Sequence, residues 1–169
     1  GYRIFVQNIL TLGNGSIIGY TTGFSTAGSI QQGGATASAV THSLGGSSAT
    51  QTATVPTAAT GGANYYYQPF QSVRGYSITG SSTTPTFLRG GAGGASGAGG
   101  GVVILAARYI SLSSGAATIN APGTAGSGGG GGGVVIIVSS APTLLTGVTT
   151  SVVGGTGCAA GTSIYLQVP

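Results

Sequence analysis

Residues 123 to 140 read GTAGSGGGGGGVVIIVSS and place a run of glycines directly before a run of β-favouring residues. The glycine run is Gly128 to Gly133, and the apolar run that follows it is Val134 to Val138. Because glycine loses more backbone freedom on ordering than any other residue, a glycine run is normally a flexible linker. A linker has no reason to end at the first residue of a strand, so we interpret these glycines as a structural element.

The same combination occurs upstream, where Gly99 to Gly101 precede Val102 to Leu105. Val102 stands 32 residues before Val134, and a degenerate third copy at the same step aligns Phe70 to Val73 with Val102 to Leu105. The C-terminal stretch GGTGCAAGTSIYLQV is another glycine tract before a strand, at a slightly shorter spacing. Similarity at a fixed period is the signature of stacked structural units, and chance alignment of low-complexity sequence is the alternative.

The chain has 169 residues, enough for one domain with a buried core, and carries almost no charge. It contains no Asp or Glu, and its four cationic residues are arginines, at Arg3, Arg74, Arg89 and Arg108. These lie far apart and form no basic cluster, so we expect no nucleic-acid partner. We predict a single glycine-rich β domain over 1–169, with a strand and Ser/Thr-rich part at 1–89 and polyglycine–strand repeats at 90–169.

The apolar pattern favours strands throughout. No segment has the three-to-four-residue spacing of an amphipathic helix, whereas YRIFVQNILTL at 2–12 is typical of a strand. Glycine segments can pack backbone to backbone in an extended helix of the polyproline II type. We therefore predict an all-β fold, a glycine-rich repeat or solenoid-like β structure with packed polyglycine segments of polyproline II type. The predicted structural glycines are Gly99, Gly100, Gly101, Gly128, Gly129, Gly130, Gly131, Gly132 and Gly133.

Side chains that perform catalysis are nearly absent. Acid–base, metal-dependent and glycosidic chemistry uses carboxylates, histidines or thiols, and this chain offers only His42 and Cys158. Calcium sites need carboxylates, and the glycine tracts lack the Lys-Ser or Lys-Thr of a phosphate loop. We expect no enzyme activity, no cofactor and no metal. Cys158 stands beside two alanines, which favours a small buried thiol over a reactive one.

Two further features are candidates for recognition or modification. The aromatic cluster Tyr65, Tyr66, Tyr67 and Phe70 is either part of the core or an exposed recognition patch, since tyrosine offers a large contact area with a polar tip. Asn14 begins the sequence Asn-Gly-Ser, which reads either as a simple turn or as a glycosylation site.

No apolar run approaches the eighteen or so residues of a membrane span, so we expect a protein that does not span a membrane. Residue 1 is Gly rather than Met, and no positively charged leader precedes an apolar core. We interpret the chain as processed from, or part of, a longer polypeptide.

The stretches GYRIFVQNILTLGNGSII, HSLGG, LRGGAGGASGAGGGVVILAARYISL and GAATINAPGTAGSGGGGGGVVIIVSS occur in this order. In that order they resemble the glycine-rich domains of bacteriophage tail-fibre and other virion surface proteins, and of some prokaryotic secreted proteins. The resemblance covers most of the chain and is weakest from Gly19 to Ala63. It implies a β-rich, glycine-packed virion or surface module, and loops between polyglycine segments bind host receptors in similar tail-fibre tip adhesins. This chain departs from them in having no acidic residue.

Together these features predict a structural protein at a virion surface or outside the cell. We expect a tail-fibre, tip or capsid-surface component that acts in assembly and in host attachment. Its partners would be further copies of itself, other virion or surface proteins and a host-surface receptor. The alternative is a secreted, self-assembling filament, sheath or surface-layer protein of a prokaryote.

The absence of carboxylates also predicts unusual tolerance of acid. Acid denaturation is mostly the protonation of carboxylates and the charging of buried histidines, and here only His42 and the chain terminus titrate between neutral and low pH. We expect the fold to persist from neutral pH to about pH 2. Circular dichroism against pH would test this, and a loss of the β signal between roughly pH 5 and 3 would contradict it.

Overall fold

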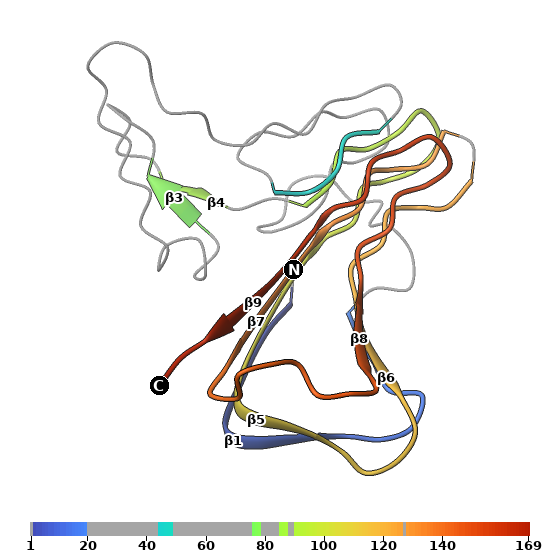
Figure 1. Cartoon of the computed structure of the whole chain (residues 1–169). Helices are drawn as coiled ribbons and strands as arrows, with labels where there is room; N and C mark the ends of the chain where they lie inside the picture. The colour runs from blue at the N-terminus through green and yellow to red at the C-terminus, as the bar shows by residue number, and fades with distance from the viewer. Residues whose placement is uncertain (1, 20–43, 49–75, 79–84, 88–89, 127) are drawn as a thin grey trace.

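The computed structural model describes residues 2–19, 44–48, 76–78, 85–87, 90–126 and 128–169 (Figure 1). These residues contain strands and turns and no helix. The strands are β1 (Tyr2–Leu12), β2 (Ile17–Gly19), β3 (Tyr76–Ile78), β4 (Pro85–Phe87), β5 (Val102–Leu112), β6 (Ala117–Asn120), β7 (Val134–Ser139), β8 (Val148–Ser151) and β9 (Thr162–Gln167).

Two sheets in which all strands are parallel make up most of the described fold. The larger has the order β1-β5-β7-β9, and the smaller has the order β2-β6-β8. In Figure 1 the two sheets diverge from the glycine-rich segments at one end toward the turns at the other. The short strands β3 and β4 form a separate antiparallel pair.

The chain passes from the four-stranded sheet to the three-stranded one through short turns at 13–16 and 113–116 and through a longer loop at 140–147. The turn after β1 contains Gly15 at φ 73°, and the turn after β5 contains Gly115 at φ 66°, a left-handed conformation that favours glycine. The two turns are bonded to each other, because Gly15 N–H donates to the Ala116 carbonyl at 2.7 Å and Ala116 N–H donates to Asn14 Oδ1 at 3.2 Å. The chain passes through a strand of the smaller sheet between β5 and β7, and again between β7 and β9. These neighbouring strands of the larger sheet therefore run parallel without a helix between them.

The main core lies between the two sheets. Four alternate side chains of β5 and β7 point toward the three-stranded sheet and are at most 1% exposed, namely Val103, Leu105, Val135 and Ile137. They pack against Ile119 and Val148 of that sheet. The intervening residues of β5 and β7 form a second apolar cluster on the opposite face, composed of Val102, Ile104, Val134 and Ile136. The long apolar runs of β5 and β7 are thus buried on both faces, as is usual for parallel sheets.

The glycine run 128–133 is enclosed by backbone. It is hydrogen-bonded to or in contact with the segments 44–48, 90–94, 97–101, 121–124, 152–155 and 158–161. Gly131 N–H donates to the Ala92 carbonyl at 2.8 Å, and Gly132 N–H donates to the Ala159 carbonyl at 3.0 Å. A Cβ added at Gly130 would overlap the Ala98 carbonyl oxygen. The tract is therefore ordered and packed, and backbone occupies the space that side chains would need.

The segments around this run accept small side chains. They read APGT at 121–124, where Ala121 is fully buried, and CAAG at 158–161, while Val153 in the segment 152–155 is 58% exposed. The pure glycine sequence at 128–133 follows from its position at the centre of the packed segments.

The predicted fold class, an all-β repeat or solenoid, is wrong. Apart from the antiparallel pair β3–β4, the described strands form two parallel sheets, a strand arrangement otherwise usual in α/β proteins, and not one regular series of repeating turns. The 32-residue step does relate Val102 to Val134. Val134 also pairs with Thr162, 28 residues on, which is the slightly shorter spacing expected for the C-terminal copy. However, Tyr2 pairs with Val103 across 101 residues, which no repeat of this period predicts.

The reason for this error lies in the other neighbour of β5. A regular repeat would place the degenerate copy at 70–73 beside β5, but β1 occupies that side. Strand partners are selected by the apolar faces that they bury together, not by their distance in the sequence. Residues 70–73 themselves lie outside the described residues.

Candidate assembly surface

Several candidate residues from the sequence fall outside the part of the chain that the structure describes. These are Tyr65, Tyr66, Tyr67, Phe70, His42, Arg74 and Arg89. Their roles stay predictions. The described residues include Asn14, Cys158 and the glycine tracts, which lie at different places in the fold.

Cys158 belongs to one of the segments that surround the central glycine run. Its side chain is partly buried, and its Sγ donates to the Gly129 carbonyl at 3.1 Å. Asn14 is exposed at the turn after β1, with its Oδ1 bonded to Ala116 N–H. Within the described residues, no group of three or more metal-ligating side chains occurs, and no helix is long and apolar enough to cross a membrane.

The first and last strands of the chain are the two edges of the larger sheet. Among the described strands, β1 pairs with β5 alone, and β9 pairs with β7 alone. An edge strand presents unpaired N–H and C=O groups, and proteins usually protect such an edge with lysine, proline or an inward-pointing charge. Between Tyr2 and Leu12 the one charged residue is Arg3, and β9 contains neither a charge nor a proline.

Large apolar side chains are exposed along β1. Phe5 is 68% exposed and Ile9 is 52% exposed. Between them the pairing of β1 with β5 shifts by one residue, at Val6/Ile9, and such a bulge bends the strand. The bulge divides β1 into a first part, Tyr2–Val6, alongside the rest of the four-stranded sheet, and a second part that pairs with the end of β5.

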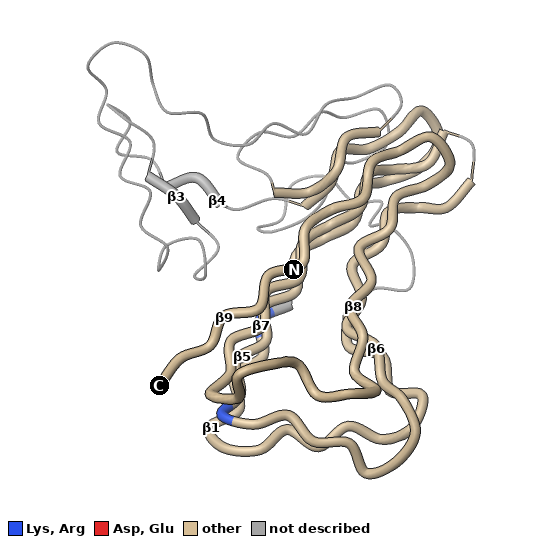
Figure 2. Tube along the Cα trace, in the orientation of Figure 1, with Lys and Arg blue, Asp and Glu red and all other residues tan. Residues whose placement is uncertain are grey.

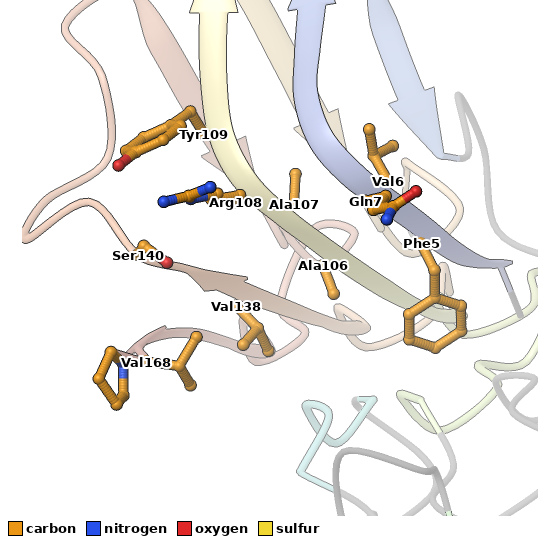
Figure 3. A pocket seen from close by; sticks show the side chains of 11 residues that line it. Phe5, Val6, Gln7, Ala106, Ala107, Arg108, Tyr109, Val138, Ser140 and Val168 are labelled. Atoms are coloured by element: carbon orange, nitrogen blue, oxygen red, sulfur yellow. The ribbon is translucent and has the colours of Figure 1, made fainter.

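An open groove crosses the outer face of the four-stranded sheet near this bend (Figure 3). Its volume is about 730 Å³. The pairing places Phe5, Ala106 and Val138 in one row across three neighbouring strands, with the small Ala106 as the floor between larger side chains. Val168 and Pro169 line the groove beyond the end of β9.

Arg108 supplies the positive charge of the groove. Its guanidinium lies 5.5 Å from the centre of the Tyr109 ring, within the range of a cation–π contact. The described arginines, Arg3 on β1 and Arg108 on β5, appear in blue in Figure 2. The Arg108 carbonyl accepts from both Ser139 Oγ (3.0 Å) and Ser140 N–H (3.1 Å), which ties the end of β7 to the bend of β5.

This surface has the chemistry of an interface. It combines an open apolar row, the two edge strands of the described sheet and one guanidinium, and the residues that line the groove include no carboxylate, histidine or thiol. The sequence predicted strands near both ends of the chain but gave no indication of the groove. The groove arises from the pairing of residues 5, 106 and 138, and no local sequence signal indicates that these residues meet.

The fold and this surface define a glycine-packed protein of two parallel sheets with an exposed apolar edge. No protein-family model matches the chain, and no curated protein or solved structure is significantly similar to it.

Proposed function

We propose that this chain is a structural component of a virion surface, such as a tail-fibre, tip or capsid-surface protein, that works as a homo-oligomer. The observation that carries the proposal is that both edge strands of the described four-stranded sheet, β1 and β9, lack lysine and proline, and that Phe5 on β1 is 68% exposed. Long unprotected edges are templates for pairing with another chain. In a structural protein, such pairing is the function.

Composition supports the same proposal. With no Asp or Glu and only four cationic residues in 169, the surface has few charges to solvate a monomer or to repel a second copy.

The resemblance of the GYRIFV and glycine-tract segments to phage surface domains favours a virion protein over a secreted one. A receptor at the host surface is a further proposed partner.

A secreted filament, sheath or surface-layer protein of a prokaryote is the second candidate. Edge pairing that continues from copy to copy gives an open filament rather than a closed ring, and this favours the alternative. Neighbouring genes would separate the two, because tail or capsid genes accompany a virion protein and secretion genes accompany a filament protein.

Light scattering on protein purified without denaturant tests directly whether the chain forms a homo-oligomer. We expect a mass that rises with concentration above the 16.0 kDa of one chain. Immunogold labelling of particles and of cell surfaces would then show which structure contains the protein. A 16.0 kDa monomer at every concentration would contradict both candidates.

A further inference from the structure

We propose that copies of this chain associate head to tail, with β9 of one copy pairing in parallel with β1 of the next. This inference rests on the proposed self-assembly and assigns it to a particular pair of strands. The four-stranded sheet ends in β1 on one side and in β9 on the other, so one copy offers both halves of the contact.

The existing pairing defines the register of the added strand. Across the sheet, Arg3, Ile104, Ile136 and Ile164 form one row, and Phe5, Ala106, Val138 and Leu166 form the next. All three strand pairs are parallel, and in each of them the residues of a row lie directly opposite one another. A further strand that continues the same rows beyond β9 would place Phe5 of the added copy beside Leu166.

The side chains on both faces agree with this register. On the outer face, the exposed Phe5 would cover the partly buried Leu166, which packs against the outer apolar cluster. On the core-facing side, Ile4 would lie beside Tyr165, and both residues already pack against the main core. A slip of one residue would turn Arg3 and Phe5 toward the core side, which disfavours that register.

The contact is limited to the first part of β1. Tyr2–Val6 would face Ser163–Gln167, where β9 ends, and the bulge begins directly after Val6. Ile9 lies beyond the bulge and would have no β9 residue opposite it. The smaller sheet has one strand fewer, so β2 of the added copy would not reach β8, and we assign the interface to the larger sheet alone.

The symmetry of this contact differs from that of a two-fold dimer. Pairing of unlike edges is heterologous and leaves one edge of each kind free at the two ends, so growth continues. A two-fold dimer through β1 would instead bring Phe5 close to β1 of its partner and would leave β9 unpaired in both copies. The two arrangements predict different residue contacts and can be separated by experiment.

Matched lysine variants test the interface. Phe5→Lys and Ile9→Lys make the same change on the same strand at similarly exposed positions, 68% and 52%. We expect Phe5→Lys to weaken self-association by roughly tenfold, because lysine on an edge opposes pairing, and Ile9→Lys to leave it unchanged. Light scattering over a dilution series provides the measurement, and equal thermal stability of both variants shows that the fold is retained.

Cross-linking identifies the strand pair. In a Cys158→Ser background, a mixture of the Phe5→Cys and Leu166→Cys proteins is expected to form dimers with a short thiol cross-linker. Either protein alone should form none beyond the level of the exposed Leu145→Cys control.

The outcomes separate this inference from the proposed function. A monomeric parent chain would overturn the self-assembly itself. An oligomeric chain in which Phe5→Lys and Ile9→Lys behave alike, or in which Phe5→Cys alone forms cross-linked dimers, would overturn only the head-to-tail pairing. An oligomeric chain that forms no cross-link in the mixture would also overturn only the head-to-tail pairing.

Discussion

Replacing Gly130 by alanine is expected to destabilise the fold by about 3 kcal/mol or more, at or beyond the upper end of typical overpacking costs. The new Cβ would overlap the Ala98 carbonyl oxygen and would lie 2.6 Å from Gly99 N. A crowded side chain in an ordinary core can change its rotamer, but these neighbours are backbone that is itself hydrogen-bonded on further sides. Relief would require whole segments to move apart and to lose their hydrogen bonds.

Gly13→Ala is the matched control for this variant. Gly13 lies in the turn after β1, and an added Cβ would meet only Ser16 Oγ, at an ordinary 3.5 Å. We expect its effect to stay within about 1 kcal/mol and to include a small gain from the less flexible unfolded chain. Urea denaturation followed by circular dichroism measures both variants. If the two unfold at the same urea concentration, the central glycine run is not packed as described.

Truncation of Leu105 to alanine is expected to cost about 3 kcal/mol and to lower the melting temperature by roughly 10 °C for a chain of this size. Leu105 is fully buried between the two parallel sheets, where it contributes to the same cluster as Ile119 and Ile137. Its removal leaves a cavity that the paired strands on either side of β5 cannot close, because β1 and β7 are fixed by their own ladders.

Leu145→Ala provides the comparison for Leu105. Leu145 is 40% exposed in the loop between β7 and β8, and its backbone carbonyl accepts from Val148 N–H at 3.0 Å, a bond that alanine retains. We expect a change within about 0.5 kcal/mol. Calorimetry measures both variants, and equal melting temperatures would show that the core between the sheets does not stabilise the molecule.

The sequence by itself determined the strands around the glycine tracts. The runs at 102–105 and 134–138 are apolar without alternation, which predicts burial on both faces, and these residues of β5 and β7 are buried in this way apart from the partly buried Val138. The turn at Gly13 to Gly15 was also predictable, because glycine and asparagine between two β-favouring runs readily adopt the left-handed conformations that tight turns require. These features depend on local chemistry, so no knowledge of the rest of the chain was needed.

Only the tertiary structure decided which strands are neighbours. Nothing in the period of the sequence places Tyr2 beside Val103, because that contact closes a loop of about a hundred residues and is selected by the faces that the two strands bury. The same long-range pairing makes β1 a sheet edge and sets Phe5 level with Ala106 and Val138, which creates the groove. The proposed assembly surface is therefore a product of strand order. The repeated sequence pattern predicts where strands form, but it does not determine which strand pairs with each edge.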